Sequence, residues 1–224
     1  MNHVANNLNH ILHDIAACCQ KRGSEAGICR LVGVSKTFTA EDITPALIAG
    51  QRIFGENRVQ EAKAKWPDLR TQFPDIELHL IGPLQSNKAG EAVALFDVIQ
   101  SVDREKIALA LAKEMEKQQR NLPIFIQVNI GNEPQKAGIK AEELSDFVSF
   151  CSQECHFQIK GLMCIPPFDE DPTPYFQQMK GLKDMLQFQE LSMGMSGDFQ
   201  TAIQHGATYV RVGSALFGKR IYAK

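Results

Sequence analysis

Eight short apolar runs, each followed by an amphipathic segment, constrain the fold of this chain more than any other feature of its sequence. Most of these runs are too short and too continuously apolar to be exposed antiparallel strands, and buried parallel strands have this appearance. The segment between two of them, 103–119, carries Ile107, Leu111 and Met115 at every fourth position, which predicts a helix. The eight predicted strands span residues 29–35, 51–55, 77–81, 96–101, 123–129, 157–164, 190–195 and 208–212.

The alternation of strand and helix predicts the α/β class. Eight βα units within 224 residues match a compact (β/α)8 barrel of the TIM type better than an open doubly wound sheet, which is the alternative. An extra helix is predicted at about residues 2–22, either covering the bottom of the barrel or packing on its side. We therefore expect a single domain over residues 1–224, with the barrel at about 29–218. The apolar face of the extra helix consists of Val4, Leu8, Ile11, Leu12 and Ile15.

The composition argues against several classes of protein. Lys and Arg number 24 against 26 Asp and Glu, so the net charge is −2, and there are only three Tyr and one Trp. Nucleic-acid-binding proteins instead carry a basic face with stacking aromatic side chains. No apolar run reaches the ~20 residues that span a bilayer, and the start MNHVANNLNH lacks the basic and apolar order of a signal peptide. We expect a cytoplasmic protein that binds neither nucleic acid nor membranes.

Six cysteines fit a reducing compartment, because none forms a C-x-x-C pair or lies at zinc-finger spacing from a histidine. The sequence thus predicts neither disulfides nor a metal site. Cys151 and Cys155 lie four residues apart on a helix predicted at 141–153 and are interpreted as small core residues. Cys164 follows an apolar strand, but a lone thiol without a paired histidine is a weak candidate nucleophile.

In such a barrel the functional side chains lie at the carboxyl ends of the strands. Lys36 ends the first strand, where a partly dry setting favours the neutral amine that forms Schiff bases, although a solvated lysine fits this position equally well. Arg211 lies inside the eighth strand between Val210 and Val212, where a charge needs a partner, either a ligand or a structural ion pair.

The last two strands end in small polar residues. Ser196-Gly197 follows the seventh strand and Gly213-Ser214 follows the eighth, and both pairs offer hydroxyl and backbone N–H groups to a phosphate. We expect Ser196 to cap the helix after it. Each pair also occurs in ordinary helix caps, so the phosphate interpretation depends on finding both together.

A Schiff-base lysine, a phosphate site and an inward arginine are the components of a pyridoxal 5′-phosphate (PLP) site. Six runs of the sequence extend this likeness, and they resemble those of the pyridoxal phosphate homeostasis proteins, whose barrel is similar to the N-terminal domain of alanine racemase. The resemblance covers about residues 31–218. The six runs are LVGVSKT, FGENRVQE, HLIGPLQSNK, GLMCIPP, MGMSGD and VRVGSALFG.

The resemblance implies PLP as the cofactor, with Lys36 as the aldimine lysine and Arg211 facing the pyridine nitrogen. It gives no role to Lys136 or Cys164. His79 has an alternative interpretation as a packed, hydrogen-bonded core residue. The cofactor-binding residues that the resemblance implies are Lys36, Asn57, His79, Met163, Ser196, Gly197, Arg211, Gly213 and Ser214.

Catalysis is not expected at this site. A guanidinium disfavours the protonated pyridine, so the ring is a weak electron sink. Racemisation also needs two bases, of which Lys36 could be one, and in alanine racemase the second is a tyrosine from an extra β domain for which we expect no room here. Tyr175, Tyr209 and Tyr222 are not predicted at the barrel mouth.

We therefore expect a non-catalytic protein that buffers or delivers PLP, with PLP-dependent apo-enzymes as recipients. We expect a monomer or a weak dimer. Two alternatives stay open: a small PLP-dependent amino-acid racemase, and a barrel that binds another phosphorylated metabolite.

Overall fold

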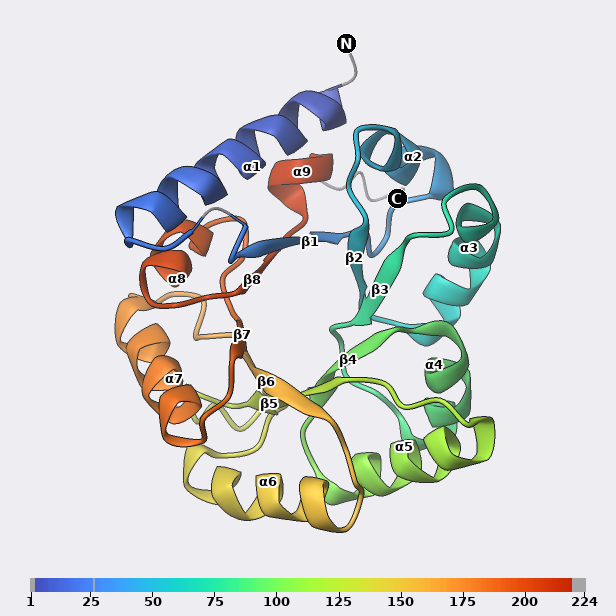
Figure 1. The fold of residues 1–224 in the computed structure, drawn as a ribbon, viewed down its shortest axis with the longest axis vertical. Helices are drawn as coiled ribbons and strands as arrows, with labels where there is room; N and C mark the ends of the chain where they lie inside the picture. The colour runs from blue at the N-terminus through green and yellow to red at the C-terminus, as the bar shows by residue number, and fades with distance from the viewer. Residues whose placement is uncertain (1–2, 26, 219–224) are drawn as a thin grey trace.

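The computed structural model describes residues 3–25 and 27–218 (Figure 1). Its strands form a closed barrel in which every neighbouring pair is parallel, in the order β1 to β8. The predicted TIM-type barrel is confirmed, and the open sheet is excluded. The strands are β1 (Arg30–Val34), β2 (Ile53–Glu56), β3 (Glu77–Leu80), β4 (Val98–Val102), β5 (Ile124–Val128), β6 (Ile159–Cys164), β7 (Glu190–Ser192) and β8 (Tyr209–Val212).

Helices surround the strands as an outer ring (Figure 1). The helix predicted at 103–119 is present as α5, whereas the one predicted at 141–153 begins with the 3₁₀ turn η2 before it continues as α6, and such turns are frequent at helix starts. The helices are α1 (His3–Lys21), α2 (Ala40–Ile48), α3 (Val59–Gln72), α4 (Ala89–Leu95), α5 (Glu105–Gln118), α6 (Leu144–Gln153), α7 (Thr173–Met185), α8 (Phe199–Gln204) and α9 (Ser214–Phe217), with the 3₁₀ turns η1 (Ser86–Lys88) and η2 (Ala141–Glu143).

Helix α1 packs on the side of the barrel, beside α8 and α9 (Figure 1). The Asn7 amide donates to the Leu216 carbonyl at 3.0 Å and so joins α1 to α9. The predicted apolar face is buried except for Leu12, which is 43% exposed, so the prediction that this whole face packs against the barrel was wrong at Leu12. Leu12 lies at the edge of the helical stripe, and Cys18 and Cys19 continue the buried face instead. The predicted first residue of this helix, Asn2, lies outside the described residues.

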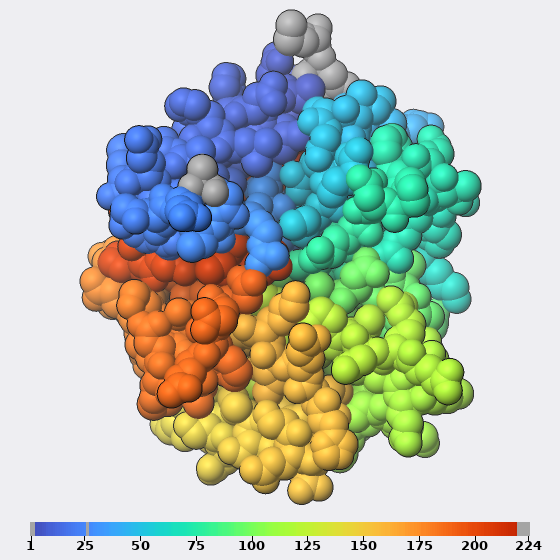
Figure 2. Space-filling model, viewed as in Figure 1, coloured from blue at the N-terminus to red at the C-terminus, as the bar shows by residue number. Residues whose placement is uncertain are grey.

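The apolar residues form two packed regions. The larger one lies between the strands and the helices, and the smaller one fills the interior of the barrel. In the space-filling view, side chains cover the ring of strands and no open channel passes through it (Figure 2). Within the described part of the chain, no helix is long and apolar enough to cross a membrane. The interior cluster consists of Val32, Val98, Phe125, Met163 and Tyr209.

Candidate functional site

Lys36 lies in a tight turn directly after β1. The turn is closed by Phe38, whose backbone N–H donates to the Ser35 carbonyl at 3.1 Å. Thr37 has a φ of 70°, in the left-handed region that β-branched residues avoid. A residue in such a conformation costs on the order of 1–3 kcal/mol and persists only where its surroundings hold it. Lys36 itself is half-buried.

Helix α3 supplies the groups that hold this turn. The Lys65 side chain is only 8% exposed, and its ammonium donates to the Ser35 carbonyl at 2.8 Å and to the Phe38 carbonyl at 3.0 Å, on either side of Lys36. The backbone N–H of Thr37 donates to the Glu61 carboxylate. The turn is therefore fixed at both ends and in its middle, which explains how Thr37 retains its conformation.

A buried carboxylate completes this arrangement. Glu56, fully buried at the end of β2, has one carboxylate oxygen 2.9 Å from the Lys65 ammonium. The same oxygen accepts from the Ser35 hydroxyl at 2.5 Å and from the Trp66 indole at 3.0 Å. Burial raises the pKa of Glu56, while Lys65 and the two other donors oppose this rise. We call Glu56, Glu61 and Lys65 the turn clamp; the sequence interpretation missed all three, although Glu61 and Lys65 stand at the helical i, i+4 spacing.

Arg211 lies in the barrel interior, only 4% exposed. Its Nη1 donates to the Ser192 hydroxyl at 2.8 Å and its Nη2 to the Cys164 carbonyl at 2.7 Å. Burial lowers the pKa of Arg211. The partners of the charge are thus two neutral acceptors, and no ion pair links it to a described residue. Its two bonds use two of the five N–H donors of the guanidinium. The Nε–H donates to no acceptor in the part of the chain that the structure describes, so it is among the N–H groups left for a ligand.

The loops after β7 and β8 meet through Ser196. The predicted cap is wrong: α8 begins after Asp198, whose carboxylate accepts from the Met195 N–H at 2.5 Å. The Ser196 hydroxyl instead accepts from the Ala215 N–H in the other loop, at 3.4 Å. Helix α8 begins three positions after Ser196, at Phe199, so Ser196 is too far from it to be the cap.

A close approach explains Gly213 at the start of α9. A Cβ at this position would lie 3.2 Å from the Val34 carbonyl, so glycine lets the loop pass close to the end of β1. Gly197, in the loop after β7, and Ser214, the first residue of α9, are exposed. Together the two loops offer hydroxyl and backbone N–H groups to an anion.

The strand order brings some of the predicted site residues to one edge of the barrel. β1 pairs with β8 and with β2, so Lys36, Gly213-Ser214 and Asn57 follow three adjacent strands. Asn57 is half-buried, and a Cβ on Gly82 would meet its carbonyl oxygen at 2.4 Å, so the loop after β3 lies against it. Met163 is fully buried in the interior cluster.

His79 lies deeper than these residues. It is fully buried, with Nδ1 2.6 Å from the Gln100 amide nitrogen and Nε2 2.6 Å from the Glu77 carboxylate. Its ring centroid is 5.6 Å from that of Tyr209. Burial lowers the pKa of His79. The structure therefore agrees with a hydrogen-bonded core residue, while its contact with a cofactor stays a prediction.

Cys164, Tyr209 and Tyr175, which the sequence analysis also considered, are buried or bound to other side chains. The Cys164 thiol is fully buried, and burial raises its pKa to about 12, which disfavours the thiolate that a nucleophile needs. The Tyr209 ring lies under the Arg30 guanidinium, 4.0 Å from ring centroid to Cζ, and the Tyr175 hydroxyl donates to Glu170. Tyr222 lies outside the described residues.

Comparison with known proteins identifies the family. The sequence model of the family described as "Alanine racemase, N-terminal domain" matches residues 7–221. Relatives named "Pyridoxal phosphate homeostasis protein" are 39% identical in Vibrio cholerae, over 100% of this chain and 99% of theirs, and 37% identical in Aquifex aeolicus, over 96% and 97%. The chain belongs to the pyridoxal phosphate homeostasis family. The resemblance found in the sequence is confirmed.

Solved structures agree with this family membership. PipY of Synechococcus elongatus with PLP bound is 38% identical, with a TM-score of 0.83 over 96% of this chain and 100% of that one. Alanine racemase of Clostridium difficile has a TM-score of 0.71 at 13% identity, over 96% of this chain and 57% of that one, which shows a shared fold alone.

Proposed function

We propose that this protein binds PLP covalently through Lys36 and keeps it available for PLP-dependent apo-enzymes, as part of PLP homeostasis. One observation carries the proposal. The half-buried Lys36, in a turn that Lys65 holds, lies at the same edge of the barrel as the loops after β7 and β8, which a hydrogen bond joins. Arg211 lies buried inside the same barrel. The names of the relatives and the PLP bound to PipY support the same ligand.

The residues present fit the three polar groups of PLP. The Lys36 amine would condense with the aldehyde and release one water molecule. The unused Nε–H of Arg211 suits a ring nitrogen that only accepts. Ser196, Gly197, Gly213 and Ser214 would bind the phosphate. In this proposal Asn57 and Met163 line the ring, and His79 lies behind them.

The surroundings of Arg211 favour storage over catalysis. PLP supplies an electron sink when its ring nitrogen is protonated, and an arginine, which has no acceptor, disfavours that form. Tyr209 is 1% exposed and Tyr175 donates to Glu170, so neither hydroxyl serves as a base on a bound amino acid. We infer a protein that holds PLP without acting on amino acids.

The covalent step is tested by the visible spectrum of purified protein with added PLP, followed by borohydride reduction and mapping of the labelled peptide. We expect a chromophore in the wild type, none in Lys36→Ala, and an unchanged one in Lys140→Ala, which alters an exposed lysine. Label at another lysine, or equal chromophores in all three proteins, would refute the role of Lys36.

Storage and catalysis are distinguished by two further measurements. We expect no stereospecific exchange of the α-proton of alanine in D₂O, and such exchange would favour a racemase instead. We also expect the PLP-loaded protein to reactivate a PLP-dependent apo-enzyme, and the loaded Lys36→Ala sample to give no more activity than the free PLP it contains. Failure to reactivate any apo-enzyme would argue against delivery.

A further inference from the structure

An unbroken chain of hydrogen bonds runs from Arg211 across the barrel interior to Glu77. The Arg211 Nη1 lies 2.8 Å from the Ser192 hydroxyl, which lies 2.6 Å from the Gln100 amide oxygen. The Gln100 amide nitrogen lies 2.6 Å from His79 Nδ1, and His79 Nε2 lies 2.6 Å from the Glu77 carboxylate. We call these five residues the relay. They come from strands β8, β7, β4 and β3, so only barrel closure brings them together.

The two ends of the relay fix the position of every hydrogen between them. A guanidinium only donates, so the Ser192 oxygen accepts and its hydroxyl hydrogen points to the Gln100 oxygen. The Gln100 amide nitrogen also only donates, so His79 Nδ1 carries no hydrogen. A neutral ring then has its hydrogen on Nε2, where the Glu77 carboxylate accepts it.

The reversed orientation of Gln100 is disfavoured. It would direct two donors at the Ser192 oxygen and leave the Ser192 hydroxyl hydrogen without a partner. It would also protonate His79 at Nδ1, so that a neutral ring would face the Glu77 carboxylate with a bare Nε2. A doubly protonated ring would avoid this repulsion, but His79 is fully buried, and burial disfavours the cation. One arrangement therefore satisfies all four links.

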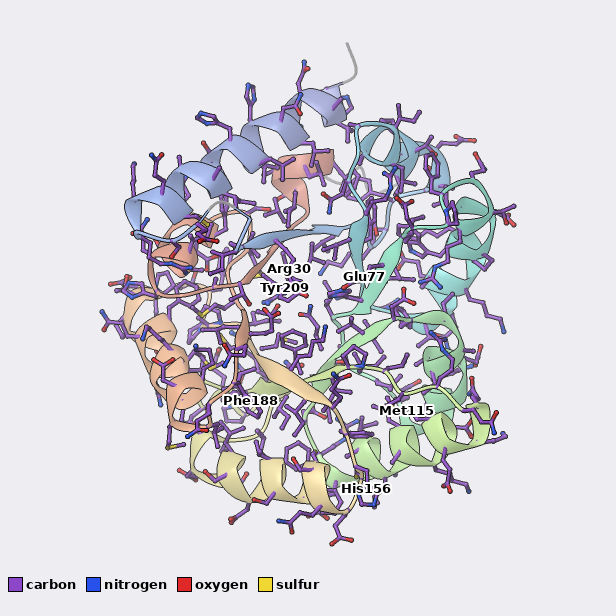
Figure 3. The ribbon with its side chains drawn as sticks, in the orientation of Figure 1. Arg30, Glu77, Met115, His156, Phe188 and Tyr209 are labelled. Atoms are coloured by element: carbon purple, nitrogen blue, oxygen red, sulfur yellow. The ribbon has the colours of Figure 1, made fainter. Side chains whose placement is uncertain are left out.

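Nearly all of the relay is buried away from solvent. Ser192, Gln100 and His79 are fully buried, whereas the Glu77 side chain is 40% exposed near the start of β3. Glu77 lies near Arg30 and Tyr209 in the middle of the strand ring (Figure 3). In a dry interior, aligned hydrogen bonds are electrostatically strong and a broken link leaves costly unpaired groups. Such a chain restrains the orientation of the guanidinium at its end.

We propose that Gln100, His79 and Glu77 are positioning residues that orient Arg211 toward the bound PLP ring, acting through Ser192. This inference rests on the proposed function, because it takes Arg211 as the partner of the ring nitrogen. None of the three needs to touch the cofactor. The exposed carboxylate of Glu77 supplies the negative end of the chain, which suits the buried cation at the other end.

The test combines affinity with the state of the His79 ring. Gln100→Met removes both polar atoms at similar length. Gln51→Met is the matched control, since Gln51 is also a buried glutamine and donates to the backbone carbonyls of Leu31 in β1 and Ile53 in β2. We expect Gln100→Met to weaken PLP binding about five- to tenfold and Gln51→Met to change it less than about twofold. Thermal unfolding of both apo variants checks that they are folded.

A double-mutant cycle separates positioning from general damage. If Gln100 acts through Arg211, Gln100→Met should have no effect on affinity in the Arg211→Met background. An equal loss in both backgrounds, or no loss in either, would overturn the proposal while leaving PLP binding by the wild type intact. A wild type that fails to bind PLP would refute the proposed function itself.

The ring state of His79 is measured without any cofactor. Nitrogen NMR of the ¹⁵N-histidine-labelled apo protein should show His79 protonated at Nε2 and bare at Nδ1, and Gln100→Met should change this signal. A wild-type ring protonated at Nδ1 would overturn the relay, because Gln100 could not then donate to it.

Discussion

Replacing Lys65 with methionine should destabilise the apo protein far more than the loss of a surface lysine does. The Lys65 side chain is 8% exposed, and its ammonium lies 2.9 Å from the carboxylate of the fully buried Glu56 side chain. Removing one partner of a buried ion pair leaves the other charge buried without a partner and lowers the free energy of unfolding by about 3–5 kcal/mol. At about 2–4 °C per kcal/mol for a chain of this size, the midpoint of thermal unfolding should fall by roughly 6–20 °C.

The assay is thermal and urea unfolding of the apo protein, with Lys63→Met as the control. Lys63 lies on the same helix, is 64% exposed and pairs with Glu91 at 3.2 Å, so its loss should cost less than about 1 kcal/mol. Adding Glu56→Gln to Lys65→Met removes the stranded charge and should recover about half of the loss. A Lys65→Met cost below about 1 kcal/mol, or a double variant less stable than the single, would refute this reasoning.

Two further predictions concern buried titratable groups. Burial raises the pKa of the Cys164 thiol to about 12, so Cys164 should resist iodoacetamide at pH 8 in the native protein and react after unfolding; rapid native labelling of its peptide would contradict this. Burial lowers the pKa of His79, so the His79 ring binds a second proton more readily in the unfolded chain than in the native protein. The free energy of unfolding should therefore fall as the pH drops below about 6.5. His79→Gln should flatten this decline by up to about 1.4 kcal/mol per pH unit, and parallel pH profiles for both proteins would exclude His79 as its source.

The barrel could be predicted because its signal is local. Each strand is a short apolar run and each helix has apolar residues at helical spacing, so the order of strands and helices can be predicted from the sequence. The prediction failed where the burial of a residue depends on how its helix or strand lies against the other elements. Leu12 has the spacing of a core residue, but the side of the barrel covers a narrower stripe of α1 and leaves it exposed.

The site could be predicted only in part. Lys36 and Arg211 were identified because a charged residue beside or within an apolar strand is conspicuous in a sequence. The cap assigned to Ser196 was wrong because α8 begins only after Asp198, and because the partner of Ser196 is in another loop. The surroundings of Lys36 were missed because Lys65 looks like any lysine on an amphipathic helix.

The sequence by itself determined the eight βα units and the family. The tertiary structure decided which polar groups meet. Lys65 contacts a turn 30 residues away, and Gln100 meets Ser192 across 92 residues. The physical reason is that such contacts depend on barrel closure and on the register of parallel strands. Apolar periodicity sets which face of a strand is buried, but it carries no information about which buried polar atoms will pair.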